Sequence, residues 1–269
     1  MQPKETGRIH LLPAKAAPIV CIIRRKPSKC FHLIKWDTST DRFEHGSWFR
    51  GKVYAMRCDI SFDGQWIVYL VMGPGGNAWS GICKVPFLTP THEAPSDGTA
   101  FGGGYWARRD LLLLNGWRPK VRPRGLPFQT LPYTARNNDD EGVLYPRLER
   151  DGWKRAGPFG QERKIEGSKK NLVACENDAG WFWKPTPAHP TLRAFYRGYL
   201  DHGRTFEFAL DEYPGLLGPD VEWATWDCRG QLLVSRAGGV ARYDLDALAR
   251  GKPSFEKSFE DLAPPGKTK

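Results

Sequence analysis

The sequence contains no hydrophobic run long enough to cross a membrane. Its longest apolar stretches, around residues 17–23 and 111–114, have the length of single strands, whereas a membrane-spanning helix needs about 20 apolar residues. The first 13 residues carry Lys4, Glu5 and Arg8 ahead of a short apolar patch and Pro13, so they lack the apolar segment of a secretory signal. We therefore expect a cytoplasmic protein without membrane contact.

Cysteine is scarce and scattered. The six cysteines contain no CxxC pair and no tight spacing, unlike the cysteines of small disulfide-rich domains. They are Cys21, Cys30, Cys58, Cys83, Cys175 and Cys228. We expect reduced thiols in the core, with a disulfide between Cys21 and Cys30 across a hairpin as the alternative.

Motifs that bind cofactors or metals, or that carry nucleophiles, are also missing. There is no G-x-S-x-G elbow, no phosphate-binding G-x-x-x-x-G-K-[ST] loop and no G-x-G-x-x-G after a strand. The segment Asp59-x-Ser61-x-Asp63-Gly64 matches the first half of a calcium-binding EF-hand loop, but position 12 is Leu70 instead of a bidentate Glu. We therefore expect no cofactor and no metal, and no residue is assigned a catalytic role.

Paired carboxylates cannot be recognised from spacing, because the two acids of a glycosidase lie far apart in sequence. The carboxylates available for such chemistry are Asp59, Asp63, Glu222 and Asp227. A carbohydrate-active enzyme therefore stays open as an alternative function, although acids in hairpin turns are usually structural.

Aromatic residues are abundant, with 11 Trp, 9 Tyr and 14 Phe in 269 residues, which indicates a folded chain with one sizeable core. Apolar and polar residues alternate with period two along most of the chain, and a helical period appears only at residues 243–250. Strands are predicted at 19–25, 31–37, 42–49, 56–61, 66–71, 105–108, 111–115, 192–200, 205–210, 222–227, 231–236 and 239–245.

Tight turns before an aromatic or aliphatic strand start recur at glycines 64, 116, 152, 180 and 230, on average about 40 residues apart, near the length of one propeller blade. Asp63-Gly64 and Asp151-Gly152 are predicted to be hairpin turns. We predict an all-β fold, a small irregular β-propeller of about five blades, with a β-sandwich or barrel as the alternative. Residues 1–250 are predicted to form a single β domain, and residues 251–269, rich in Pro and Lys, a flexible tail.

Two short segments carry a resemblance to a known repeat. Residues 58–69, CDISFDGQWIVY, resemble the blade hairpin of TolB-type β-propellers, and residues 223–235, WATWDCRGQLLVS, are similar to it as a second, weaker copy. Residues 7–10, 23–29, 36–37 and 43–48 are also similar to a group of bacterial proteins of about this length whose activity is not known. The first resemblance implies a propeller framework, the second implies a single domain over the whole chain, and neither implies a chemistry.

The charge distribution is polarised. Residues 1–30 and residues 108–136 each carry seven basic residues against one acid, whereas residues 201–227 carry seven acids against Arg204. Two long irregular stretches rich in Gly and Pro, residues 86–104 and 119–141, are expected to be loops and the first places to seek a partner.

One basic segment has the spacing of a binding site for an anionic partner. Arg118, Lys120, Arg122 and Arg124 alternate along residues held extended by prolines, and Trp117 precedes them. We expect a non-enzymatic binding or scaffold protein. Its partner is expected to be another protein, with an anionic ligand or nucleic acid, gripped by this stripe, as the alternative.

Overall fold

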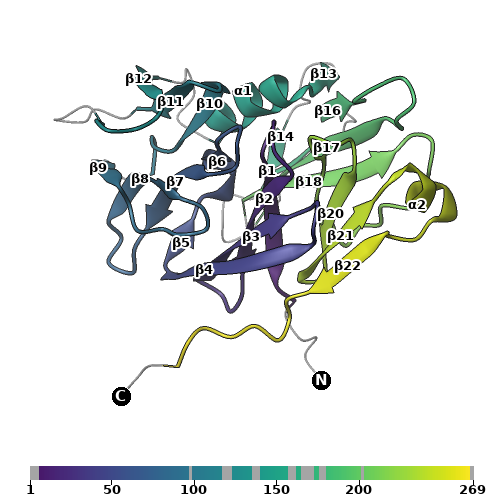
Figure 1. The fold of residues 1–269 in the computed structure, drawn as a ribbon, viewed down its shortest axis with the longest axis horizontal. Helices are drawn as coiled ribbons and strands as arrows, with labels where there is room; N and C mark the ends of the chain where they lie inside the picture. Colours follow the sequence, from purple (N-terminus) through teal and green to yellow (C-terminus); the bar gives the residue numbers. More distant parts are fainter. Residues whose placement is uncertain are drawn as a thin grey trace.

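Five β-sheets, arranged as the blades of an irregular propeller, make up the computed structural model of this chain (Figure 1). The structure describes residues 6–96, 99–116, 123–134, 140–156, 162–164, 173–175, 180–200 and 203–266. The predicted all-β, five-bladed fold is confirmed. No helix in the described part of the chain is long and apolar enough to span a membrane.

Blades 1 and 2 come from the first third of the chain. Blade 1 is an antiparallel meander of β1 (Arg8–Pro13), β2 (Ile19–Arg25), β3 (Cys30–Asp37) and β4 (Arg42–Arg50). Blade 2 contains β5 (Lys52–Val53), β6 (Asp59–Ile60), β7 (Trp66–Met72), β8 (Ala78–Lys84) and β9 (His92–Ser96), and the 3-10 helix η1 (Ala55–Arg57) lies between β5 and β6.

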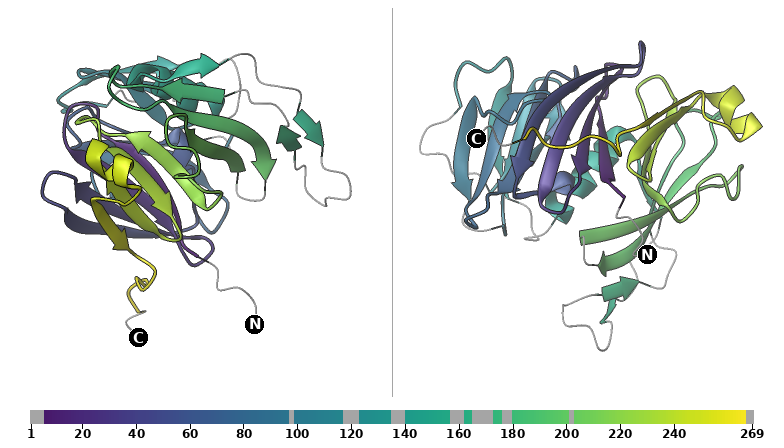
Figure 2. Two further views of the ribbon diagram at one scale, coloured as in Figure 1. Left: turned by 90° about the vertical axis from the view of Figure 1, so that its right-hand side faces the viewer. Right: turned by 90° about the horizontal axis from the view of Figure 1, so that it is seen from below.

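Blades 3 and 4 are less regular. Blade 3 consists of β10 (Gly104–Arg108), β11 (Leu111–Asn115) and β12 (Gln129–Tyr133), and β12 runs parallel to β11. Blade 4 is formed by β13 (Lys154–Ala156), β14 (Glu162–Lys164), β15 (Val173–Cys175), β16 (Gly180–Trp183), β17 (Leu192–Leu200) and β18 (Gly203–Leu210). The pair β14 and β15 projects from the body of the molecule (Figure 2).

Blade 5 closes the ring against blade 1. It contains β19 (Val221–Trp226), β20 (Leu232–Arg236), β21 (Gly239–Tyr243) and β22 (Phe255–Ser258), with helix α2 (Leu245–Arg250) between β21 and β22. Because β22 pairs with β21 and Phe259 is buried, the packed sheet continues past residue 250, where the sequence placed the start of a flexible tail.

The core follows the ring. Buried side chains of blades 1, 4 and 5 form one cluster, those of blades 1 and 2 a second, and those of blades 2 and 3 a third. Strand β1 packs beside β19, and β18 packs on β19, so neighbouring blades are joined by side chains.

Helix α1 (Glu141–Asp151) was not predicted from the sequence. It begins after Asp140, carries Glu141 in its first turn and ends at Gly152, whose φ of 109° places it in the left-handed region. Gly152 was predicted to lie in a hairpin turn, and this prediction was wrong, because the residue caps a helix. The buried positions 143, 144, 147 and 148 do follow a helical period, but one of them is Arg147.

The two long stretches predicted as loops each contain a strand, which corrects that prediction. Strand β9 lies within residues 86–104 and pairs with β8, and β12 lies within residues 119–141 and pairs with β11. Both are edge strands, and β12 is largely exposed, so neither shows a strong apolar alternation.

Candidate functional site

Helix α1 lies between blade 3 and blade 4 and reaches the other blades through its side chains (Figure 1). Its Tyr145 ring packs 5.2 Å from Trp181 of blade 4, and the Arg147 guanidinium donates to His10 Nε2 of blade 1 at 3.3 Å. Arg147 also donates to the carbonyl oxygen of Cys58 in blade 2. The helix therefore connects blades 1, 2 and 4 through its side chains.

The second arginine of α1, Arg150, forms a buried ion pair. Its guanidinium contacts both carboxylate oxygens of Asp59, one of them at 3.2 Å, and donates to the Trp106 carbonyl at 2.9 Å. Arg150 also contacts Asp151 at 2.8 and 3.0 Å. Burial lowers the pKa of Arg150, but the charges of Asp59 and Asp151 outweigh it and raise this pKa above its usual value.

His10, which accepts the bond from Arg147, is neutral. Burial, together with the charge of Arg147, lowers the pKa of His10 well below its ordinary value. Its Nε2 accepts the bond from Arg147, so the proton of the neutral ring sits on Nδ1. The ring lies 4.1 Å from that of Trp223.

A cavity beside these groups is too small for a substrate. It is lined by Asp59, Arg147, Asp151, Thr225 and apolar neighbours, and its volume of about 10 Å³ is that of about one water molecule. Among the described residues, no three His, Cys, Asp or Glu side chains come together as metal ligands.

The four carboxylates that a carbohydrate-active enzyme would need are engaged in structural bonds. Asp59 pairs with Arg150, and Asp63 accepts from Gln65 N at 3.1 Å in the turn before β7. Glu222 accepts from Ile9 N at 2.5 Å, and Asp227 accepts from the backbone N of Arg229 and Gln231 in the turn after β19.

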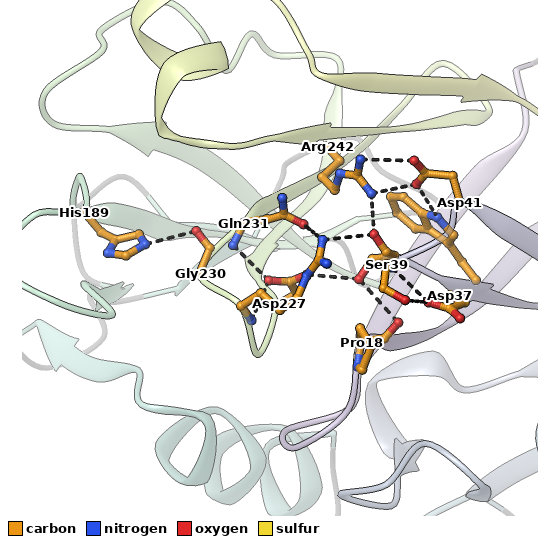
Figure 3. A network of polar contacts seen from close by, with 12 residues as sticks. Pro18, Asp37, Ser39, Asp41, His189, Asp227, Gly230, Gln231 and Arg242 are labelled. Atoms are coloured by element: carbon orange, nitrogen blue, oxygen red, sulfur yellow. Dashed lines mark hydrogen bonds and ion pairs between the residues drawn. The ribbon is translucent and has the colours of Figure 1, made fainter.

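The seam between blades 1 and 5 is closed by polar contacts (Figure 3). At one end Thr38 Oγ1 donates to Asp227 Oδ2 at 3.1 Å, and Arg242 pairs with Asp41 at 2.7 Å. At the other end Gly7 N donates to Glu260 at 2.7 Å, and Glu260 also pairs with Lys26. No described strand of blade 1 pairs with a strand of blade 5, so these contacts and apolar packing hold the two ends of the chain together.

Glu222 is the most perturbed acid of the seam. Burial raises its pKa to about 7, against the favourable bond from Ile9 N and the charge of Arg8. Near neutral pH this carboxyl therefore changes charge inside an interface between blades.

The acidic segment predicted from the sequence is partly paired within the fold. Three of its acids form ion pairs with cations of residues 184–197, at 2.5 Å for Asp211, 3.1 Å for Glu212 and 2.7 Å for Glu207. The cations are Arg193, Lys184 and Arg197 respectively.

Most of the predicted basic site lies outside the described residues. Of Trp117, Arg118, Lys120, Arg122 and Arg124, the structure describes Arg124 alone. Arg124 is exposed, and its backbone N–H donates to His92 Nε2 at 3.3 Å, which places this part of the chain beside β9 of blade 2.

Two other cations, Lys84 and Arg109, lie at the same end of blades 2 and 3 as Arg124. Phe128, four residues after Arg124, packs its ring against Trp66 at 5.6 Å and Trp106 at 5.4 Å. Lys84 Nζ lies 3.9 Å from the centre of the Trp66 ring, and Arg109 follows β10, the strand that holds Trp106.

We call Lys84, Arg109 and Arg124 the basic end. All three side chains are exposed, and no described carboxylate forms an ion pair with them. The sequence signalled Arg109 and Arg124 through the charge of residues 108–136, but not Lys84, because a single lysine at a strand end has no distinguishing pattern.

Comparisons with known proteins assign no family. No protein-family profile matches the sequence, and no curated protein matches it. An uncharacterised protein from Listeria monocytogenes EGD-e has a similar solved structure, with a TM-score of 0.33 and 10% identity over 87% of this chain. This chain covers 62% of the length of that protein.

The β-propeller domain of the trilobed protease from Pyrococcus furiosus is also similar, with a TM-score of 0.29, 9% identity, and coverage of 96% of this chain and 86% of that one. Likenesses this weak carry no argument about function. The assignment of a five-bladed propeller therefore rests on the sheets and contacts of this chain.

Proposed function

We propose that this protein is a non-enzymatic binding protein whose propeller framework presents the basic end to an anionic partner. The observation that carries the proposal is the contrast between two sets of charges. The acids Glu207, Asp211 and Glu212 are paired within the fold, whereas the cations of the basic end have no described carboxylate partner.

The stripe of Arg118, Lys120, Arg122 and Arg124, with Trp117 before it, belongs to the same proposal. Its last member, Arg124, is one of the three residues of the basic end. Guanidinium groups suit phosphate and carboxylate oxygens, and the release of counterions from a polyanion favours binding at low salt.

A binding function is favoured over carbohydrate hydrolysis by the state of the carboxylates. A glycosidase needs two acids that face a sugar from a cleft, about 5 to 9.5 Å apart. Asp59 is instead held by Arg150, and Glu222 and Asp227 serve the closure of blade 5 on blade 1.

The test is binding of a labelled single strand of about 12 nucleotides, and of a Glu-rich peptide, between about 50 and 200 mM salt. The basic-end variant, K84S/R109S/R124S, is expected to lose about tenfold or more in affinity. The slope of its log affinity against log salt concentration should fall by the equivalent of about two phosphate contacts. The fourfold stripe variant R118S/K120S/R122S/R124S is expected to behave alike.

The matched control removes the same charge elsewhere. Lys29, Arg50 and Lys52 are exposed. Arg50 and Lys52 lie where the chain passes from blade 1 to blade 2, and Lys29 lies beside them in the turn between β2 and β3, where its carbonyl accepts from Gly51 N. Lys52 is opposite Met72, at the far end of β7 from Trp66. The variant K29S/R50S/K52S is expected to bind within about twofold of the wild type apart from the general effect of net charge. Equal losses in both variants, or no binding of either ligand below about 100 μM at low salt, would overturn the proposal.

A further inference from the structure

One phenylalanine stands out on the surface. Phe87 is 43% exposed, and among the Phe, Tyr and Trp side chains that the structure describes it is the one that is exposed rather than buried or partly buried. It lies in the turn after β8, three residues beyond Lys84. A single exposed apolar side chain is common on a protein surface, so what distinguishes Phe87 is the set of groups around it.

The backbone that carries this ring is fixed on both sides. Phe87 N donates to the Lys84 carbonyl at 2.8 Å, and the Phe87 carbonyl accepts from Cys83 Sγ at 2.5 Å. The next residue, Leu88, donates to Ser47 Oγ of blade 1 at 2.9 Å, and its carbonyl accepts from the Tyr69 hydroxyl at 3.1 Å. The ring is therefore held outward by a turn that both blades brace.

The surroundings of the ring are cationic and polar. Lys84 lies in the same turn, and Thr89 and Thr91, which follow, are exposed. His92 then begins β9 opposite Ile82, two residues before Lys84, and accepts the bond from Arg124. With strands about 4.8 Å apart and about 3.3 Å per residue, the backbones of Phe87, Lys84 and Arg124 lie within the reach of a few nucleotides.

These surroundings discriminate between two kinds of anionic partner. A protein interface is built on a contiguous apolar patch with a polar rim, whereas the exposed residues that flank Phe87 in the chain, Lys84, Thr89 and Thr91, are cationic or polar. A lone ring among cations fits a flat base whose flanking phosphates meet the cations, which is how single-stranded nucleic acids are held.

We propose that Phe87 is a stacking platform for an unpaired base, and that the anionic partner of the basic end is a single-stranded nucleic acid. This inference rests on the proposed function and names its ligand class. Stacking on an aromatic ring is independent of salt, whereas the cations give the salt dependence. The two contributions can therefore be measured separately.

The experiment compares F87A, F87W and L245A for binding to a labelled single strand of about 12 nucleotides, to the duplex of equal length and to a Glu-rich peptide. Leu245 is the control, because it is 40% exposed on α2 of blade 5. F87A is expected to lose about 5- to 100-fold on the single strand with an unchanged salt slope, while F87W binds as the wild type.

The peptide and the duplex distinguish the possible failures. The inference predicts that F87A changes their binding by less than about twofold, and that L245A changes none of the three. If F87A binds the single strand as tightly as the wild type while the basic-end variant is weakened, Phe87 is no platform and the proposed function still stands. If the basic-end variant binds every ligand as tightly as the wild type, both proposals fail.

Discussion

Glu222 couples the closure of the ring to pH. Its carboxyl lies between blades 5 and 1, where it accepts a bond from Ile9 N, and burial raises its pKa to about 7 from an ordinary 4.5. Between these two values the folded protein keeps a proton that the unfolded chain has released. Stability contributed by this group is therefore present at acidic pH and is lost as the pH rises from about 4.5 to about 7.

The size of the effect follows from the shift. A difference of about 2.5 pKa units corresponds to about 3 kcal/mol at most, at 1.36 kcal/mol per unit. Because the carboxyl keeps some exposure to water, solvent screening reduces this to on the order of 1 to 2 kcal/mol. Gln has the same shape, accepts from Ile9 N and carries no charge, so E222Q isolates the ionisation.

The assay is urea unfolding followed by tryptophan fluorescence at pH 5, 6, 7 and 8, since the chain has 11 Trp residues. E222Q is expected to match the wild type near pH 5 and to exceed it by about 1 to 2 kcal/mol at pH 8. E44Q is the control, because Glu44 is half exposed beside Lys35 on blade 1. A difference between E222Q and wild type that does not grow with pH would show that the ionisation of Glu222 does not destabilise the fold.

Three further substitutions or reactions probe the framework. Gly64 has a φ of 73°, and an added Cβ would lie 2.5 Å from Ile19 Cβ. G64V should therefore lower the free energy of unfolding by about 1 to 3 kcal/mol, whereas G75A, where nothing lies within 4 Å of an added Cβ, should not. Equal thermal midpoints of G64V and the wild type would contradict this. R150M leaves Asp59 buried without its partner and should lower the free energy of unfolding, measured with urea, by about 3 to 5 kcal/mol. The double variant D59N/R150M should recover part of this loss. If the losses of the two single variants add up in the double variant, Asp59 and Arg150 are not coupled. Cys228 is exposed, whereas burial raises the pKa of the Cys58 thiol to about 12, so alkylation of the native protein without reductant, read by peptide mass, should label Cys228 and spare Cys58. Labelling of Cys58 in the folded protein would show that this part of the core opens.

The alternating strands could be predicted from the sequence because each hairpin carries its own local signal. The strands 19–25, 111–115 and 192–200 begin and end where they were expected, since alternation and turn residues bound them. The Asp63-Gly64 turn was predicted for the same reason, and Gly64 N donates to Ser61 O at 2.9 Å within it.

Helix α1 and the contacts of its buried arginine could not be predicted from alternation and turn residues. The buried face of α1 contains Arg147, and Pro146 lies inside the helix. Because the helix is also polar on average, the sequence shows no clear apolar stripe with a helical period. The partners that make a buried arginine acceptable, His10 and the Cys58 carbonyl, lie 137 and 89 residues away in sequence. Only the assembled ring brings them together.

The candidate site shows the same limit. Local charge pointed to Arg124, but the grouping of Arg124 with Lys84 depends on His92 and on the packing of Phe128 against Trp66. The exposure of Phe87 depends on a turn braced by Ser47 of another blade. A sequence shows each of these residues singly, and the packing of blades 1, 2 and 3 makes them neighbours.

The most direct test of the account is lysine acetylation footprinting with and without a saturating single strand of about 12 nucleotides, read by peptide mass. Lysines under a bound ligand lose reactivity, and exposed lysines lie at both ends of blade 2, Lys84 opposite Trp66 and Lys52 opposite Met72. Lys84 and Lys120 are expected to be protected, with Lys29 and Lys52 unchanged. Protection of Lys29 and Lys52 with Lys84 still reactive would contradict this.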